Sequence, residues 1–216
     1  DKNPAAPDGF TFDANQIPRF VRAHYIDPIR MKRISKFRSA IGPDYSDDFE
    51  KCRSMKNIFE PRSDCDWSAL EIFSPLSGTI KEIVPGATGS QISIQSQEYP
   101  DFEIRIFHIL SSDSLIAGRT LTPGEKIGAL FGQGVLSNIA VSVNTTKGWK
   151  LISYFDVMTD SVLSTFALCQ VYGRLSFIIN KEARDGDPLT CNGETFTSEG
   201  TLENWQAEDT AFQHQP

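Results

Sequence analysis

The chain has 216 residues, of which 39% are hydrophobic and 11% aromatic, enough to bury a core in one large or two small domains. No apolar run of about 18 residues occurs, so no membrane span is predicted. The formal net charge is −7, with basic residues gathered between Arg19 and Arg62 and acidic ones between Asp185 and Asp209. This asymmetry is typical of two solvated faces, and no nucleic-acid-binding signature accompanies the basic residues.

Residues 1–66 are predicted to form an irregular N-terminal segment packed on the rest of the protein. Residues 1–9 contain prolines and few apolar side chains, so we expect a loose arm. Asp47 followed three residues later by Glu50 matches a capping box, which predicts a short helix from this point through Met55.

Residues 67–152 are predicted to be β-structure throughout. Apolar and polar residues alternate in several short stretches separated by glycine- and proline-containing turn pairs. The stretches are 70–73, 79–83, 91–94, 102–107 and 139–143. Many short strands with regular turns indicate a small barrel or sandwich.

Residues 153–216 are predicted to form a helix and a tail. Phe155, Met158, Val162 and Phe166 recur at three- and four-residue spacing, which predicts an amphipathic helix over 154–169. The remaining tail lacks a strong period. We expect it to wrap on the β-region, tied by a cysteine, with the final dozen residues mobile.

The four cysteines contain no CxxC pair and no zinc-finger spacing. An even number in two local groups favours an oxidising compartment over four thiols in a cytosolic protein. Three pairings are possible, and proximity in sequence predicts Cys52 with Cys65 and Cys169 with Cys191, leaving no free thiol.

Two further features favour export. Asn144 begins an Asn-Thr-Thr sequon, a candidate N-glycosylation site. The sequence starts at Asp1 rather than at a methionine, which favours the mature form of a secreted protein. The predicted localisation is therefore extracellular.

The β-region carries an ordered set of motifs. Residues 73–84 read FSPLSGTIKEIV, a strand later ends in Ile106-Phe107-His108-Ile109, and glycine-marked turns follow up to residue 133. This order resembles the duplicated hybrid barrel of lysostaphin/LytM-type zinc peptidases (peptidase family M23) and of the glucose-type phosphotransferase IIA domain. The resemblance covers about residues 40–145. It implies a mainly β fold, a small barrel or sandwich of duplicated hybrid motif type.

In the LytM-type peptidases that this chain resembles, zinc is held by the two ligands of an H-x-x-x-D segment and by one histidine of a final H-x-H. On that pattern Asp47 takes the aspartate position, and Pro43 replaces the first histidine. His108 matches a middle histidine, while Ala140 and Ser142 stand where the final pair should be. Proline, alanine and serine do not supply the missing donors, so the resemblance implies a degenerate site with no metal and no cofactor.

Other chemistries find less support. A phosphocarrier needs a second histidine beside its nucleophile, and none precedes His108 within the β-region. Each catalytic candidate also has a structural explanation, since Asp47 can cap a helix and His108 can be a barrel residue bonded to a carbonyl. No nucleophile elbow, P-loop, zincin motif or dinucleotide fingerprint occurs.

The sequence therefore predicts a secreted, non-catalytic pseudo-peptidase that binds a peptide or glycan, including cell-wall material, in a peptidase-like cleft. The side chains expected to line the cleft are Tyr45, Trp67, Trp149, Tyr154, Arg38 and Arg53. The alternative is an active extracellular hydrolase of the same class that uses Asp47 and His108 with further ligands from the C-terminal segment. A purely structural surface protein is the third hypothesis.

Overall fold

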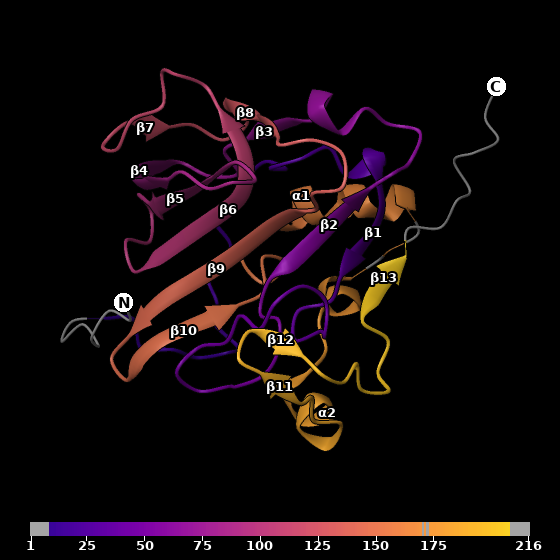
Figure 1. The fold of residues 1–216 in the computed structure, drawn as a ribbon. Helices are drawn as coiled ribbons and strands as arrows, with labels where there is room; N and C mark the ends of the chain where they lie inside the picture. Colours follow the sequence, from indigo (N-terminus) through magenta and orange to yellow (C-terminus); the bar gives the residue numbers. More distant parts are fainter. Residues whose placement is uncertain (1–8, 170, 172, 208–216) are drawn as a thin grey trace.

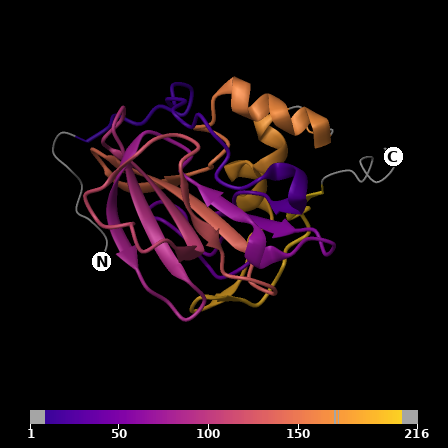
Figure 2. The ribbon, with the colours of Figure 1, turned by 90° about the horizontal axis from the view of Figure 1, so that it is seen from above.

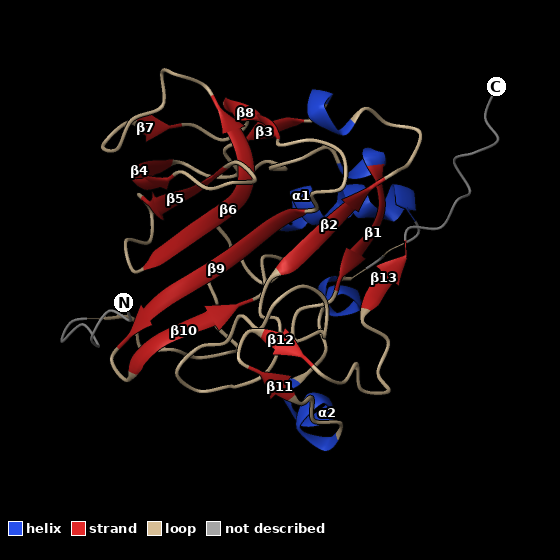
Figure 3. Ribbon diagram, in the orientation of Figure 1, coloured by secondary structure: helices blue, strands red, loops and turns tan. Residues whose placement is uncertain are grey.

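The computed structural model describes residues 9–169, 171 and 173–207, and the fold is mainly β, as predicted (Figures 1 and 3). The described strands are β1 (Met31–Ser35), β2 (Asn57–Pro61), β3 (Glu71–Phe73), β4 (Gly78–Val84), β5 (Ser90–Ser96), β6 (Phe102–Ser111), β7 (Thr120–Leu121), β8 (Lys126–Leu130), β9 (Ser137–Thr145), β10 (Gly148–Ile152), β11 (Cys191–Asn192), β12 (Thr195–Phe196) and β13 (Trp205–Ala207). The described helices are short: α1 (Asp160–Leu163), α2 (Lys181–Gly186) and the 3-10 helices η1 (Pro28–Arg30), η2 (Trp67–Ala69), η3 (Ser164–Cys169) and η4 (Arg174–Phe177).

In the described part of the chain, eleven strands form one antiparallel sheet. Its order is β13-β1-β2-β9-β6-β5-β4-β7, with β10 paired to β9 and with β8 paired to both β6 and β3. The long strands β6 and β9 change partners along their length, which bends the sheet without joining its two ends. The described strands thus form an open sheet and no closed barrel. Strands from all three predicted segments contribute to it.

β6 changes partner at His108. The residues before it pair with β9, and the residues after it pair with β8. His108 itself has a φ of 62°, in the left-handed region that non-glycine residues rarely adopt. Gly89 packs against this bend, where a Cβ would lie 2.9 Å from the carbonyl carbon of His108. The bend therefore depends on a glycine neighbour as well as on a strained histidine.

The main hydrophobic core lies on one face of the sheet, here called the back face. Ile104, Ile106 and Val141 point into it, and the helical segment α1–η3 covers it with Val162 and Phe166. Figure 2 shows this helical segment on one side of the sheet and the β11–β12 hairpin on the other. Burial of these apolar side chains supplies the main stabilisation of the fold.

The predicted helix over 154–169 begins later than the sequence indicated, at Asp160. The buried amide of Asn57 accounts for the difference, because its Oδ1 accepts hydrogen bonds from Ser153 Oγ (3.1 Å) and from the backbone N–H of Tyr154 (3.2 Å). These bonds hold residues 153–154 in a turn rather than in a helix. The apolar spacing nevertheless identified buried positions, because Phe155, Met158, Val162 and Phe166 all lie in the core.

The opposite, front face of β6, β9 and β10 carries a second and smaller cluster. Alternation along each strand places Arg105, Phe107, Asn138, Ala140 and Trp149 on this face. The loop that precedes β2 covers part of it with Tyr45. The front face therefore combines polar and aromatic side chains, in contrast to the aliphatic back face.

The helix predicted from Asp47 through Met55 is absent, and that prediction is wrong. The Oδ1 of Asp47 accepts the backbone N–H groups of Phe49 and Glu50, both at 2.8 Å, as a capping carboxylate would. Its Oδ2 instead accepts the N–H of Leu151 at 2.8 Å, and Asp48 accepts the N–H of Trp149 at 3.3 Å. Both carboxylates thus tie the loop to the outer edge of β10, and tertiary contacts override the local signal.

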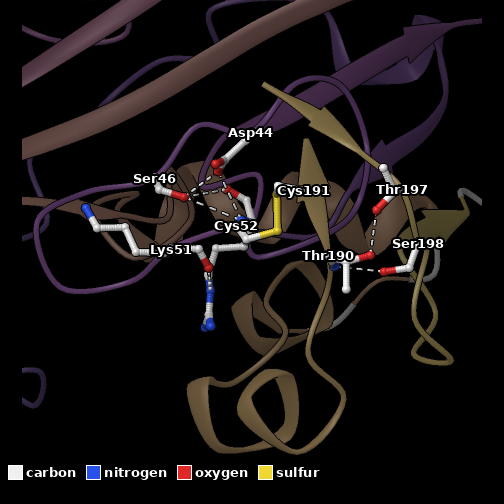
Figure 4. Close-up of a disulfide and its surroundings, with 9 residues drawn as sticks. Asp44, Ser46, Lys51, Cys52, Thr190, Cys191, Thr197 and Ser198 are labelled. Atoms are coloured by element: carbon white, nitrogen blue, oxygen red, sulfur yellow. Dashed lines mark hydrogen bonds between the residues drawn. A yellow bond between two sulfur atoms is a disulfide. The ribbon is translucent and has the colours of Figure 1, made fainter. Parts of the chain in front are cut away.

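A single disulfide joins distant parts of the described chain (Figure 4). Cys52 is bonded to Cys191, 139 residues away, with 5.8 Å between their Cα atoms. The predicted pairs Cys52–Cys65 and Cys169–Cys191 are both wrong, because each would need one of these two sulfurs. Cys65 is a buried free cysteine, so the expectation of no free thiol is wrong as well. Proximity in sequence failed here because the fold brings the β11–β12 hairpin to the loop that carries Cys52.

Some expectations fall at the chain ends. Residues 1–8 of the expected N-terminal arm lie outside the described residues. Of the final dozen residues expected to be mobile, 205–207 form β13 against β1, and the rest lie outside the described part. No helix within the described residues is both long and apolar enough to cross a membrane.

Candidate functional site

The front face is organised around a lysine. Lys56 directly precedes β2, which pairs with β9, and it lies on the face of β9 that carries Asn138 and Ala140. Its ammonium lies 4.5 Å from the ring centroid of Tyr45 and 4.6 Å from that of Phe107, within the range of cation–π attraction.

This ammonium is buried but not paired. Lys56 is 5% exposed, and burial lowers its pKa to about 8, against an opposing effect of the Glu194 charge. No hydrogen bond or ion pair joins its Nζ to any residue that the structure describes. A pKa near 8 leaves Lys56 largely protonated at neutral pH. The fold therefore holds a buried positive charge in cation–π contact with two aromatic rings.

We expect Lys56→Met to raise the free energy of unfolding at pH 7 by about 1 to 3 kcal/mol, because the folded state disfavours the charged lysine. The folded protein loses this proton at about pH 8, and the unfolded chain loses it near the ordinary lysine pKa. Wild-type stability should therefore rise with pH above about 8, and the advantage of methionine should shrink there. Urea unfolding at pH 7 and at pH 9.5 measures both effects.

The matched control for this substitution is Lys126→Met, which removes an exposed lysine paired with Glu71. Its effect should stay within about 0.5 kcal/mol at both pH values. Destabilisation by Lys56→Met at pH 7 would contradict the assignment of Lys56 as a residue that is retained at the expense of stability.

His108 adjoins the lysine. Its Nδ1 lies 2.9 Å from Thr88 Oγ1 and 3.1 Å from the carbonyl oxygen of Thr88. Because a carbonyl only accepts, Nδ1 carries the proton, and Nε2 keeps a lone pair in the neutral ring. Burial lowers the pKa of His108, the hydrogen bond to Thr88 raises it, and the charge of Lys56 lowers it again. The net pKa is lowered, so the imidazole is neutral at pH 7.

Asn138 adds an unsatisfied amide to the same face. It lies directly opposite Phe107 in the pairing of β6 with β9. The residue is 7% exposed, and its Oδ1 is enclosed without a hydrogen-bond partner in the described structure. Buried polar groups almost always have partners, so this enclosed acceptor is an exception among the described residues. We call Tyr45, Lys56, Phe107, His108 and Asn138 the Lys56 cluster.

Two predicted binding aromatics do come together beside this cluster. Tyr45 and Trp149 both pack against the small apolar cluster of the front face. Arg105 lies between them, with its Nη1 3.5 Å from Tyr45 Oη and its guanidinium 5.9 Å from the Trp149 ring centroid. Burial raises the pKa of the Tyr45 hydroxyl, so it remains protonated at neutral pH. Sequence reasoning found these two aromatics but missed the arginine.

Arg38 and Arg53, also predicted to bind ligand, are engaged inside the protein. Both donate to Glu50, whose side chain is 1% exposed. Arg53 also donates to Asp185 at 3.0 Å. These two guanidinium groups build a buried ion-pair network beside the Lys56 cluster.

The remaining predicted residues are dispersed. Tyr154 is buried among back-face aromatics, where it contacts Tyr25 edge to face. Trp67 packs on the main core and donates its indole N–H to the carbonyl of Arg62 at 3.0 Å. Asn144 lies on β9 opposite Trp149, and its glycosylation remains a prediction.

A hollow of about 630 Å³ opens between the β11–β12 hairpin and the loop around Gly42, and no member of the Lys56 cluster lines it. Its lining combines three hydroxyl groups, two carboxylates and a phenylalanine with small loop residues. The lining residues are Ala40, Gly42, Pro43, Glu194, Thr195, Phe196, Thr197, Ser198 and Glu199. Glu194 links the two features, because it lines the hollow and its charge acts on Lys56.

The hairpin that supplies most of this lining is fixed at its base. The Cys52–Cys191 disulfide holds it to the neighbouring loop, where Asp44 accepts hydrogen bonds from Ser46 and from the backbone of Arg53 (Figure 4). On the hairpin itself, Thr190 bonds to Thr197 at 2.6 Å and to Ser198 at 2.9 Å. The hollow therefore has a fixed wall.

The residues at this site do not fit a zinc ion. Among the described residues, no group of three or more His, Cys, Asp and Glu side chains could hold a metal. Asp47 is fully buried, and both of its carboxylate oxygens accept hydrogen bonds from backbone N–H groups rather than from His108. His108 instead faces the positive charge of Lys56, which repels a divalent cation.

The most informative residue, Lys56, was missed by sequence reasoning. It stands in the run Ser54-Met55-Lys56-Asn57-Ile58, which reads as the approach to a buried strand. A lysine among residues destined for burial was the available signal. Glu194 gave no such signal, because only the disulfide brings its hairpin to the front face.

Comparison with known proteins gives similarities of structure alone. No protein-family model matches the chain, and no curated protein matches its sequence. A zinc-containing peptidase from Vibrio cholerae is 15% identical with a TM-score of 0.44, over 66% of this chain and 41% of the other. Lysostaphin is 16% identical with a TM-score of 0.36, and the match covers 51% of this chain and 49% of lysostaphin. A chain of the SpoIIQ–SpoIIIAH pore-forming complex is 12% identical with a TM-score of 0.45, and the match covers 69% of this chain and 97% of the other.

The chain thus spans less than half the length of the zinc-containing peptidase and of lysostaphin. A putative glycyl-glycine endopeptidase LytM from Ruminococcus gnavus also stands among its structural neighbours, at 12% identity and a TM-score of 0.38. The similarity concerns the fold and carries no conclusion about activity.

Proposed function

We propose that this protein is a non-catalytic, exported binding protein that holds a peptide in the hollow beside the Lys56 cluster. One observation carries the proposal: a buried, unpaired ammonium occupies the centre of the polar front face, next to a neutral histidine. This arrangement opposes metal-dependent hydrolysis but suits recognition of a polar chain. The disulfide supports an oxidising compartment.

The alternative of an active hydrolase is not supported. It requires Asp47 and His108 to act together, yet the carboxylate of Asp47 is buried and fully hydrogen-bonded to the backbone of β10 and its own loop. The described partners of His108 are Thr88 and the charge of Lys56, so the carboxylate of Asp47 is not among them. The Asp47–His108 pair that this alternative requires therefore has no support.

A peptide fits the hollow better than a glycan does. Glycan-binding sites present aromatic platforms, whereas the lining here has a single phenylalanine among hydroxyl and carboxylate groups. Hydroxyl and carboxylate groups at spaced positions match the alternating N–H and C=O groups of an extended peptide. Cell-wall peptides are one class of such ligand.

Thr195→Arg is expected to abolish binding of cell-wall peptides, because it places a long side chain in the hollow. Thr195 is exposed on β12, so the variant should remain folded. Binding is measured by NMR titration with soluble peptidoglycan fragments, with linear peptides of the same stem, and with chitooligosaccharides as the glycan arm. The matched control is Thr120→Arg, an exposed threonine on the remote strand β7.

The outcomes separate the hypotheses. Wild type and Thr120→Arg should bind the peptide-bearing fragments, and Thr195→Arg should not. Zinc-dependent cleavage of the same fragments by wild type would revive the hydrolase. Binding of chitooligosaccharides alone would replace peptide by glycan, and equal binding by Thr195→Arg would place the site elsewhere.

A further inference from the structure

We propose that the ammonium of Lys56 receives the C-terminal carboxylate of the bound peptide. The inference rests on the function proposed above, and it names the group that the site recognises. It is carried by the unpaired state of Lys56, by the Nδ2 donor of Asn138 on the same face, and by the hollow, whose lining residue Glu194 acts on the ammonium through its charge.

The ammonium is prepared for an anion. It is held between the rings of Tyr45 and Phe107, which attract a cation from the side but accept none of its N–H groups as a carboxylate oxygen would. The Nζ atom is not fully enclosed, although the residue as a whole is 5% exposed. No described residue accepts a hydrogen bond from this ammonium, which carries three N–H donors.

Two neighbouring side chains can complete the contact. The Nδ2 group of Asn138, unlike its enclosed Oδ1, can donate to a carboxylate, and no described residue accepts a hydrogen bond from it. His108 keeps Nε2 free because Nδ1 is bonded to Thr88, and on protonation Nε2 becomes a further donor. A carboxylate at Lys56 would favour that protonation, because it supplies the negative charge that the imidazolium lacks there.

Glu194 acts as an internal competitor. Its charge raises the pKa of Lys56, yet no ion pair forms between the two side chains. An incoming carboxylate must overcome the repulsion of Glu194 before it reaches the ammonium. An anion that makes no other contact in the hollow should therefore bind weakly. An anion whose chain also contacts the β11–β12 hairpin should bind more tightly.

The groups that face the ammonium fix the pH dependence. They are Tyr45 from the loop, His108 from β6 and Glu194 from the hairpin, and of these only His108 ordinarily titrates near neutrality. Carboxylate binding should be strongest below about pH 8 and should weaken above it as Lys56 loses its proton. Protonation of His108 should strengthen it further on the acid side.

The test uses a matched pair of probes, acetyl-Ala-Ala-Ala with a free carboxylate and the same peptide as its C-terminal amide. Dissociation constants are measured by NMR titration of the whole chain at pH 7 and pH 9.5. The free acid should bind at least about tenfold more tightly than the amide at pH 7, as expected for a charge-assisted hydrogen bond. In Lys56→Met the preference and its pH dependence should both disappear.

A second pair of variants tests Glu194. Glu194→Gln should bind the free acid several-fold more tightly than wild type does. Glu182→Gln removes the same charge from an exposed position on α2, outside the hollow, and should leave the affinity unchanged. Equal tightening by both variants would show a general charge effect and would contradict a specific role for Glu194.

The failures are distinguishable. If acid and amide bind wild type equally, the carboxylate assignment is wrong while the peptide-binding function stands. If neither probe binds and the cell-wall peptides also fail, both proposals fall. Binding of a galacturonate trisaccharide in place of the peptide acid would overturn the peptide assignment and leave the carboxylate contact with Lys56.

Discussion

Glu50→Ala is expected to lower the free energy of unfolding by about 3 to 5 kcal/mol, because it leaves two arginines without their buried partner. The Glu50 side chain is 1% exposed and accepts two hydrogen bonds from Arg38, at 2.7 and 2.8 Å, and one from Arg53 at 2.8 Å. Arg38 is 14% exposed, so its charge also lies largely outside the reach of water.

The acid dependence of stability should follow from the same network. Burial alone would raise the pKa of Glu50, but the hydrogen bonds and charge of Arg38, with the charges of Arg53 and Lys150, outweigh it and lower the pKa. A carboxyl group with a lowered folded-state pKa stabilises the protein above its unfolded pKa, and that stabilisation is lost as the pH falls through the folded value. Glu50→Ala should therefore differ least from wild type in strong acid.

Urea unfolding at pH 7 and at pH 3 measures these effects. Glu71→Ala is the matched control, because it removes a carboxylate from a half-exposed pair with Lys126, and it should cost less than about 1 kcal/mol. A loss below about 1.5 kcal/mol for Glu50→Ala at pH 7 would mean that the two arginines are rehydrated without difficulty. The buried network would then contribute little to stability.

Removal of the Cys52–Cys191 disulfide is expected to cost about 4 to 5 kcal/mol in the chain-entropy model, since it closes a loop of 139 residues. The double variant Cys52→Ala with Cys191→Ala tests this by urea unfolding without reductant. Cys65→Ala is the control, because Cys65 is a free buried thiol outside the cross-link. Its loss should be nearer 1 kcal/mol.

Chemical labelling provides an independent check of the pairing. Without reductant, peptide mapping should find Cys52 linked to Cys191, and Cys65 should react with iodoacetamide only after unfolding. A Cys52–Cys65 link would restore the pairing expected from sequence proximity. Equal stability of the double variant and wild type would show that the covalent link adds nothing to the folded state.

The strands could be predicted from the sequence, whereas the contacts between distant segments could not. Alternating apolar residues located β4, β5, β6 and β9, since a pleated strand with one buried face imposes this pattern wherever it occurs. The same local logic failed at Asp47, whose carboxylate caps backbone N–H groups without a helix because Leu151 holds it to β10. It failed again at Cys52, because its partner is 139 residues away.

The sequence revealed only those site residues that carry a local signal. His108, Tyr45 and Trp149 were visible through a motif or through aromatic character, and the structure places all three on or beside one face. Lys56 was missed because a lysine is normally solvent-exposed, and its position just before a buried strand does not reveal which two rings will contact it. Tyr154 shows the converse, since an aromatic suited to binding is fully committed to the core.

The carboxylates of Asp47 and Asp48 have a consequence for self-association. A strand at the margin of a sheet normally offers its free N–H groups to any extended segment, which is how sheets extend into aggregates and how some receptors capture peptides. On β10 the N–H groups of Trp149 and Leu151 are already satisfied by these two side chains. Neither another copy of the chain nor a peptide can lengthen the sheet through these two N–H groups.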